Sequence, residues 1–405
     1  MGSYIGIDGK AREIKGVYVG VDSKARKVSK GYVGVEGVAH EILLRKEQLI
    51  LKRLSLTPLD AARENLAGCH IDDAYTLFGG GGAFFVKETT PYVDYGPLAD
   101  VDAYSQALVH TSVSPLSLTA NSLAGGSCGK YGLFGGGFID FGSFLATDFV
   151  DAYSVDLVKT SISPLSAQKG DCTAATIYGY CLFAGGVDPI VPEHYYTSVD
   201  AYNSELVQTT FEGLQEGRAG LASYGARSFI EDYGAFFGGG KNSKGFSNLV
   251  DFIDTSLVST YAPPLSVGRG GLACAPLGDS LVMLFGGGAL GSDPPSSAVD
   301  AFNINLIQWT GPSLWEAREG LAGGNVVNVT ASTSGALFVG GLNAGHPSDT
   351  ADFYDLELVH GIAPALQEAR GYLAVAPIFR ASDDVSPLFG GGAPRNPAVD
   401  AYIAE

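Results

Sequence analysis

Two residue types that can do chemistry recur along this 405-residue chain at a nearly constant spacing. The acidic type is an aspartate, with successive spacings of 49, 49, 51, 49, 52 and 48 residues, at Asp102, Asp151, Asp200, Asp251, Asp300, Asp352 and Asp400. The basic type follows a leucine by four residues, at Arg63, Arg218, Arg269, Arg318 and Arg370, with Lys169 and Ala120 in the two remaining units. Repetition argues against catalysis, because an active site needs one asymmetric place. We therefore predict structural Arg–Asp pairs, each costing roughly 3–5 kcal/mol to break where it is buried.

Motifs for catalysis or metal binding are scarce. The six histidines are scattered among different repeat units, and HExxH and P-loop patterns do not occur. The five cysteines form no CxxC pair, so we expect small buried core residues and no disulfide framework. The sequence predicts no cofactor and no metal site. Carboxylates are plentiful, which leaves a glycosidase-type pair open without favouring any two of them.

The elements that must position these residues are short strands. Seven Gly-rich segments, such as FGGGG at 78–82 and FGGG at 285–288, each precede a VDAY-like segment that contains the recurring aspartate. In the unit 265–315 the patterns LSVGRGGLACAPL, SLVMLFGGG, AVDAFN and LIQWTGPSLW indicate four strands. A period near 50 residues with four strands per unit predicts an all-β fold with seven propeller blades.

The double glycine and the downstream tyrosine resemble the kelch repeat family over roughly residues 47–405. The resemblance implies a seven-bladed kelch-like β-propeller. The chain departs from the family at the tryptophan of the last strand, which only Trp309 supplies.

The two ends of the repeat region predict how the ring closes. The last unit stops after its third strand, VDAYIAE at 399–405, whereas Gln48–Leu54 reads like a fourth strand placed before the first unit. We therefore expect a three-plus-one closure of the seventh blade, which removes a free sheet edge.

A second repeat occupies residues 1–46, where Tyr4, Tyr18 and Tyr32 lie 14 residues apart. Alternating apolar residues around Asp8-Gly9 and its two copies predict three β-hairpins, too small to bury a core alone. This segment carries nine Lys/Arg and five Asp/Glu, a net charge of +4, so the rest of the −18 chain carries −22. The acidic charge of residues 47–405 disfavours nucleic acid as a partner. The sequence has no run of about 18 apolar residues, so we do not expect membrane insertion.

The segments between the second and third strands of the first three units are rich in aromatic and acidic residues. They supply the candidate ligand-binding residues, which are Phe84, Phe85, Tyr92, Asp94, Tyr95, Phe138, Asp140, Phe141, Phe144, Glu193, Tyr195 and Tyr196. Aromatic loops on a rigid scaffold are typical of recognition surfaces, with rings that stack on sugars and acids that accept hydroxyl hydrogen bonds. The alternative is that these rings fold inward as small caps over the blades.

The 14-residue units also resemble short repeats of tail and other structural proteins of phages and prophages of Gram-positive bacteria. That resemblance implies a virion protein, in which residues 1–46 attach to other tail proteins or mediate homo-oligomeric assembly. Residues 47–405 would then recognise a host-surface glycan or protein without catalysis. A glycan-degrading enzyme and an intracellular interaction scaffold are the alternatives. The start of the chain has no secretory signal pattern, so synthesis in the cytoplasm is expected.

Overall fold

A computed structural model describes residues 4–7, 10–13, 18–21, 24–27, 30–35, 38–43, 49–86, 93–140, 144–190, 193–227, 232–278, 282–290, 294–329, 333–380 and 384–404. The chain divides into two compact units, Met1–Gln48 and Leu49–Glu405. The expected boundary, between residues 46 and 47, lies two residues earlier. No helix that is long and apolar enough to cross a membrane occurs in the described residues.

The first unit contains the three hairpins that the sequence predicts. They are β1 (Tyr4–Ile7) with β2 (Lys10–Glu13), β3 (Tyr18–Val21) with β4 (Lys24–Lys27), and β5 (Lys30–Val35) with β6 (Val38–Leu43). The innermost pairs are Ile7 with Lys10, Val21 with Lys24 and Val35 with Val38. Each pairing leaves two residues for the turn, and those turn residues lie outside the described part of the chain.

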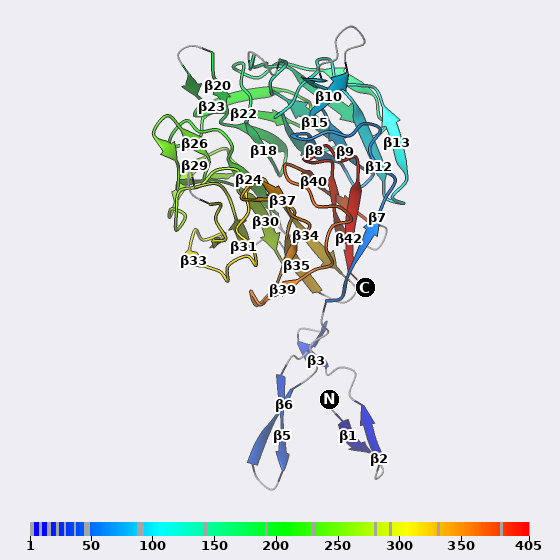
Figure 1. Ribbon diagram of the computed structural model, residues 1–405. Helices are drawn as coiled ribbons and strands as arrows, with labels where there is room; N and C mark the ends of the chain where they lie inside the picture. The colour runs from blue at the N-terminus through cyan, green and yellow to red at the C-terminus, as the bar shows by residue number, and fades with distance from the viewer. Residues whose placement is uncertain are drawn as a thin grey trace. The chain divides into compact units, whose positions relative to one another are not determined.

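The second unit is built from antiparallel blades of four strands each, which we call A to D from the axis outward (Figure 1); one bridge, Val327 to Val385, joins blades 6 and 7 into an eight-stranded sheet. Blade 1 has β8 (Ala67–Ile71), β9 (Tyr75–Gly79), β12 (Val101–Ser105) and β13 (His110–Val113); blade 2 has β14 (Ala124–Cys128), β15 (Tyr131–Gly135), β16 (Val150–Ser154) and β17 (Lys159–Ser161). Blade 3 has β18 (Thr173–Ile177), β19 (Tyr180–Ala184), β22 (Ser198–Asn203) and β23 (Gln208–Glu212); blade 4 has β24 (Ala222–Arg227), β25 (Asp232–Gly238), β28 (Val250–Asp254) and β29 (Ser259–Ala262). Blade 5 has β30 (Ala273–Leu277), β31 (Val282–Gly286), β32 (Val299–Asn303) and β33 (Gln308–Thr310); blade 6 has β34 (Ala322–Asn328), β35 (Thr333–Val339), β38 (Ala351–Asp355) and β39 (His360–Ile362). Blade 7 has β40 (Ala374–Phe379), β41 (Val385–Gly390), β42 (Val399–Ala404) and β7 (Leu51–Ser55).

Blade 7 confirms the three-plus-one closure. Its outer strand β7 comes from the N-terminal side and pairs antiparallel with β42, from Asp400 opposite Ser55 to Ala404 opposite Leu51. The observed strand starts three residues after the predicted start and ends one residue after the predicted end. Figure 1 shows the blue β7 beside the red β42.

A closed circle of backbone hydrogen bonds surrounds the axis where the A strands begin. One residue from each blade donates its N–H to the carbonyl of its counterpart in the preceding blade, over 2.6–3.2 Å. We call these seven residues the axial ring: Asn65, Ser122, Asp171, Gly220, Gly271, Gly320 and Tyr372. Asn65 donates to Tyr372, which closes the circle between blades 1 and 7. All seven have positive φ angles, so a conformation that usually needs glycine is adopted here by four other residues.

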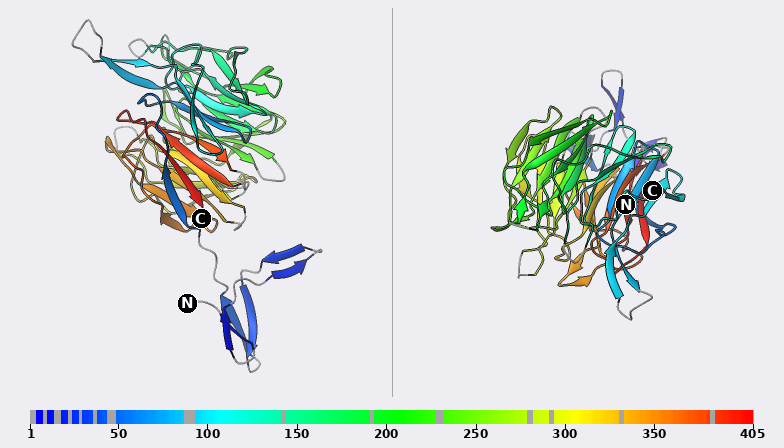
Figure 2. Two further views of the ribbon diagram at one scale, coloured as in Figure 1. Left: turned by 90° about the vertical axis from the view of Figure 1, so that its right-hand side faces the viewer. Right: turned by 90° about the horizontal axis from the view of Figure 1, so that it is seen from above.

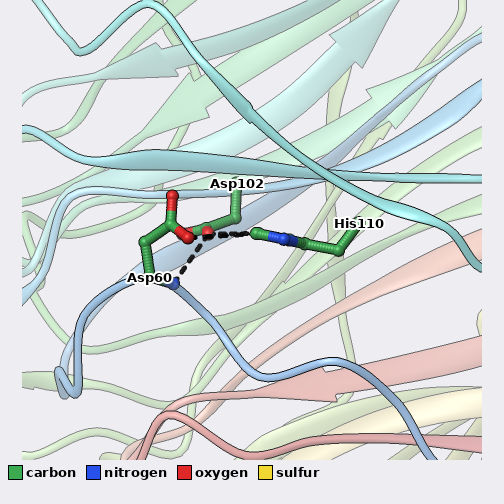
Figure 3. Close-up of side chains that lie close together, drawn as sticks. All are labelled: Asp60, Asp102 and His110. Atoms are coloured by element: carbon green, nitrogen blue, oxygen red, sulfur yellow. Dashed lines mark hydrogen bonds and ion pairs between the residues drawn. The ribbon is translucent and has the colours of Figure 1, made fainter.

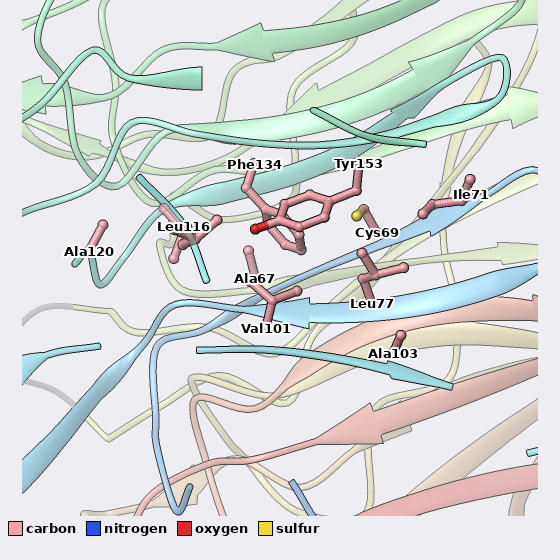
Figure 4. Packing of buried hydrophobic residues seen from close by; sticks show 11 residues of the cluster. Ala67, Cys69, Ile71, Leu77, Val101, Ala103, Leu116, Ala120, Phe134 and Tyr153 are labelled. Carbon is pink, nitrogen blue, oxygen red and sulfur yellow. The ribbon is translucent and has the colours of Figure 1, made fainter. Parts of the chain in front are cut away.

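Seven hydrophobic clusters in the described residues each join two neighbouring blades. In Figure 4, Phe134 and Tyr153 of blade 2 pack on Leu77, Cys69 and Val101 of blade 1. The cluster formed by Ala374, Leu388, Phe78 and Tyr104, among others, joins blade 7 to blade 1 in the same way. Because every blade shares its core with both neighbours, the ring is one cooperative unit.

The first glycine of the Phe-Gly-Gly segments makes this packing possible. A Cβ atom at Gly79 would lie 2.9 Å from the ring of Phe134 in the next blade, and one at Gly286 would lie 2.9 Å from Phe338. Gly390 lies in the same way against Phe78, across the closure. In these blades the glycine leaves room for the phenylalanine of the following blade, whereas blades 3 and 6 have Ala184 and Val339 at this position.

Replacing Gly286 by alanine is accordingly expected to destabilise the protein by about 1–3 kcal/mol, because the core around Phe338 would be overpacked. Gly361→Ala is the matched control, since the nearest heavy atom to a Cβ at that position is 4.0 Å away. Urea unfolding of both variants measures the difference. Equal midpoints for the two variants would contradict the packing argument.

The recurring aspartates bind the basic residues of their own blades. The ion pairs are Arg63–Asp102 (2.5 Å), Lys169–Asp200 (2.8 Å), Arg218–Asp251, Arg269–Asp300 (2.8 Å), Arg318–Asp352 and Arg370–Asp400 (2.7 Å), all with both partners buried. In blade 2, where Ala120 replaces the base, the hydroxyls of Ser117 and Ser161 and the Ser117 N–H donate to Asp151.

Six of the aspartates, from Asp102 to Asp352, also hold the segment that leads from strand D into the next A strand. Backbone N–H groups of that segment donate to the carboxylates, for example Ser266 to Asp300 over 3.1 Å and Trp315 to Asp352 over 2.9 Å. In blade 5, Gln308 of strand D donates to Asp300 as well. Burial alone would raise the pKa of Asp200, but the charge of Lys169 and hydrogen bonds from Lys169, Thr210 and Ser166 lower that pKa below its ordinary value. The aspartates therefore tie together three parts of a blade, and their role is structural.

Candidate functional site

The seven A strands enclose an axial channel of about 840 Å³. Small residues line it because neighbouring A strands approach closely: a Cβ at Gly68 would lie 2.6 Å from the carbonyl oxygen of Val375, and one at Gly125 would lie 2.6 Å from that of Gly68. Polar groups of the lining bond one another: the Ser127 hydroxyl bonds the ring and backbone of His70, and the Ser127 N–H donates to Oγ1 of Thr176. These polar groups of the channel lining therefore already have hydrogen-bond partners within the lining itself.

At the end of the channel where the A strands begin, the axial ring bounds a smaller pocket of about 220 Å³. We call this pocket the axial mouth. It is lined by the seven axial-ring residues and by the residue that follows each of them, mostly leucine. The residue before each ring residue pairs with the start of a B–C segment, as Glu64 does with Gly82, Asn121 with Phe138 and Gly170 with Val187. The B–C segments of blades 1–3 therefore lie around the axial mouth.

The axial mouth is asymmetric. Blades 4, 5 and 6 contribute glycines to it, whereas blades 7, 1, 2 and 3 contribute Tyr372, Asn65, Ser122 and Asp171. The ring of Tyr372 lies over Gly320, where a Cβ would be 2.8 Å from it, and the tyrosine is 38% exposed. A tyrosine at a φ of 51° costs on the order of 1–3 kcal/mol, a type of strain that clusters at functional sites.

Negative charge gathers around this aromatic residue. Burial raises the pKa of Tyr372, and the carboxylates of Glu319, Glu64 and Asp171 raise it further. Burial also raises the pKa of Asp171, although Lys241 and a hydrogen bond with Ser122 act in the opposite direction. The mouth thus combines a protonated phenol, carboxylates and an amide beside an aromatic face.

Tyr195 of blade 3 connects the predicted loop residues to this mouth. Its hydroxyl donates to Glu193 over 2.7 Å. Burial, this hydrogen bond and the charges of Glu193 and Asp171 raise its pKa to about 12. Tyr196 lies beside it, with its ring 4.6 Å from that of His194 and 5.9 Å from the ammonium of Lys169. Both tyrosines are partly buried and Glu193 is exposed.

Phe138 corrects the sequence prediction, because it is only 5% exposed and cannot present its ring to a ligand. It packs with Ala146, Val187 and Ala219. Its ring also occupies the space above Gly170, where a Cβ would lie 2.3 Å from it. The inward-cap interpretation is therefore right for this residue: the glycine of the next blade leaves room that a large ring fills.

The other predicted residues of blade 2 lie closer to solvent. Phe144 is 45% exposed while its ring makes an edge contact of 5.8 Å with Phe138, and Asp140 is exposed. Phe141 lies outside the described residues.

In blade 1 the B–C segment forms a hairpin of β10 (Gly82–Val86) and β11 (Val93–Pro97), with Phe84 opposite Tyr95 and Phe85 opposite Asp94. Figure 2 (left) shows this hairpin reaching out beyond the rest of the propeller. Tyr92 and the side chains of these four residues lie outside the described part of the structure. Shorter hairpins occur in the same segment of three other blades: β20 (Val187–Asp188) with β21 (His194–Tyr195), β26 (Lys241–Asn242) with β27 (Gly245–Phe246), and β36 (Leu342–Asn343) with β37 (His346–Pro347).

The axial-ring residues themselves were missed by the sequence analysis. A signal was present, since each lies two positions after the recurring basic residue or Ala120. From blade 1 to blade 7 this position holds Asn, Ser, Asp, Gly, Gly, Gly and Tyr. The difference between the blades could have drawn attention to Asp171 and Tyr372.

Comparisons with known proteins support the fold alone. No family model matches the chain, and no curated protein sequence matches it. A solved structure entitled "Structure of YjhT" is 15% identical, with a TM-score of 0.52 over 72% of this chain and 96% of that chain. The fold thus defines the class of this protein, a seven-bladed β-propeller with three-plus-one closure.

Proposed function

We propose that this protein is a binding module that recognises a glycan at the axial mouth and the adjoining B–C segments of blades 1–3. The observation that carries the proposal is the asymmetry of the axial ring, which has side chains on blades 7, 1, 2 and 3 and glycines opposite. Sugars offer hydroxyl groups to carboxylates and amides and C–H faces to aromatic rings. Asp171, Asn65 and the half-exposed ring of Tyr372 provide these partners together.

The experiment uses substitutions that the ring itself contains. Asp171→Gly and Tyr372→Gly introduce the residue that blades 4–6 have at this position, so the positive φ and the backbone circle are retained. On a glycan array, each variant is expected to bind at least about tenfold more weakly than the unaltered protein. Tyr178→Ala is the matched control, because Tyr178 is a highly exposed tyrosine in an A–B turn, away from the B–C segments.

A second set of variants tests the loops. Tyr195→Ala and Tyr196→Ala should weaken binding if the ligand extends from the mouth onto blade 3. Binding that survives all four substitutions would overturn the assignment of the site. A protein ligand in place of a glycan would appear as host-cell binding that is insensitive to removal of surface sugars.

A glycan-degrading activity is the second candidate, favoured by one observation: burial raises the pKa of Asp171, and Asp171, Glu64 and Glu319 all act on the phenol of Tyr372 in the axial mouth. A general acid needs such a carboxyl group. Asp171→Asn would then abolish turnover while binding persists. Binding without turnover by the unaltered protein excludes this candidate.

The proposal extends to where the protein acts. The 14-residue repeats and the contrast between their charge of +4 and the −22 of the remainder support attachment of the first unit to a phage particle, with the propeller directed at the host surface. Detection of the protein in purified particles tests this. A gene with no phage structural genes around it would count against it.

A further inference from the structure

Blade 1 brings together three groups that can bind a metal and that do not line the axial mouth. Asp60 belongs to the segment that leads into β8, Asp102 to β12, and His110 is the first residue of β13. The His110 Nε2 atom lies 2.6 Å from Oδ1 of Asp102 and 3.9 Å from Oδ1 of Asp60. One ligand atom from each residue lies within 4.8 Å of the others. Figure 3 shows the two carboxylates and the imidazole converging on one point.

The other blades show which part of this arrangement is structural. In blade 6, Nε2 of His360 lies 2.7 Å from Asp352, so a contact between histidine and aspartate already serves the scaffold there. At the position equivalent to Asp60, three residues before the recurring basic residue or Ala120, the other blades have Ser117, Ser166, Gln215, Ser266, Trp315 and Gln367. At the position equivalent to His110 in strand D, the other blades have Lys159, Gln208, Ser259, Gln308, His360 and, in β7, Arg53. Among the seven blades, only blade 1 combines a carboxylate at the position of Asp60 with an imidazole at the position of His110.

We propose that Asp60, Asp102 and His110 form a binding site for a divalent transition-metal ion of the Zn²⁺ class. Zinc binds imidazole nitrogen and carboxylate oxygen at about 2.0–2.2 Å, so ligand atoms around it lie about 3.3–3.6 Å apart. The distance from Asp60 Oδ1 to His110 Nε2 would shorten by a few tenths of an ångström, and the distance from His110 Nε2 to Asp102 Oδ1 would lengthen by under about 1 Å. The ion takes the place of the proton on Nε2, and the imidazole that binds it is neutral, with its one remaining proton on Nδ1.

Neighbouring groups orient the ligands. Arg63 donates to Oδ2 of Asp102, which leaves Oδ1 directed toward His110, and Ser112 donates to Oδ2 of Asp60. Such outer hydrogen bonds are usual around protein metal sites. The Asp60 side chain is 47% exposed and provides a path from solvent, while Asp102 is buried.

The charges also favour a cation. Arg63 and Asp102 compensate each other, and the carboxylate of Asp60 then leaves one negative charge beside a neutral imidazole. Asp60 follows the closing strand β7 by five residues. A bound ion would therefore tie the segment after that strand to β12 and β13, where blades 7 and 1 meet.

The test uses the full chain without an affinity tag, treated with EDTA and then titrated with ZnCl₂ in a calorimeter. We expect one tight site per chain and a higher melting temperature with zinc. Asp60→Ser and His110→Gln reproduce the residues of blade 5, Ser266 and Gln308, so both variants should fold. Each should weaken zinc binding by more than about 10-fold. Co²⁺ titration gives an independent spectroscopic readout of the coordinating groups.

The matched control is His360→Gln, which removes the equivalent histidine of blade 6 and should leave zinc binding unchanged. Failure of the unaltered protein to bind zinc at a concentration of about 100 µM would overturn the proposal. Zinc binding of unchanged affinity in Asp60→Ser or His110→Gln would also overturn it. So would a loss of affinity in His360→Gln as large as that in His110→Gln. Failure of the glycan experiment leaves this inference intact, because the two sites share no residue.

Discussion

Removing the closing strand should abolish the stable propeller. Deletion of residues 1–56 removes β7 and leaves β42 as an unpaired edge, whereas deletion of residues 1–48 keeps both strands. The pairing of β7 with β42 extends over five residue pairs and includes the ion pair between Arg53 and Asp400, at 2.6 Å. Backbone hydrogen bonds contribute about 0.5–1.5 kcal/mol each. Their combined loss therefore approaches the whole stability of a domain, about 5–15 kcal/mol.

Thermal melting followed by circular dichroism measures this effect. The 1–48 deletion should melt close to the full chain, and the 1–56 deletion should melt far lower or be unfolded. Returning residues 48–56 to the C-terminus, through a turn copied from Asn203–Leu206 of blade 3, should restore the melting temperature. That rescue separates the loss of a strand from the loss of chain length. Identical melting of the two deletions would show that β7 does not close the ring.

The second large effect is expected at the buried ion pairs, and it should be unequal for the two partners. In blade 5, Asp300 accepts from Arg269, from the N–H and hydroxyl of Ser266 and from Gln308. Apart from Asp300, the only acceptor of Arg269 among the described residues is the carbonyl of Phe285. Asp300→Ala strands a buried guanidinium and frees three other donors, at a cost of roughly 3–5 kcal/mol. Arg269→Ala leaves the carboxylate with three donors and should cost less.

Blades 2 and 3 supply the controls for this prediction. Asp151 in blade 2 lies beside Ala120 and is buried, and no ion pair among the described residues involves it, so hydroxyl and N–H donors can satisfy the carboxylate. Lys169 replaces the arginine in blade 3, so Arg269→Lys should retain most of the stability. Urea midpoints at constant slope give the free energies. A smaller cost for Asp300→Ala than for Arg269→Ala would contradict the proposed asymmetry.

The repeat features of the fold could be predicted from particular residues. The VDAY aspartates and the preceding arginines lie in the same unit, 30 to 39 residues apart, and each blade forms its pair without reference to the other blades. The missing fourth strand of the last unit and the extra one before the first unit predicted the closure for the same reason. Local pattern was sufficient because each repeat encodes one blade.

The candidate sites depended on relations between repeats. Phe138 was expected at the surface because its own segment is rich in aromatic residues. Its burial was decided by Gly170, which belongs to the next blade.

The sequence by itself determined the class of fold, the number of blades, the closing strand and the ion pairs, because these follow from spacing within one repeat. Only the tertiary structure decided that Asp171 and Tyr372, 201 positions apart, lie in one axial mouth, and that Asp60 faces His110. The physical reason is that closing the ring brings one residue of every blade to the axis and places each D–A segment across strands C and D of a blade. The chemistry of a site then depends on which side chain each repeat contributes to it.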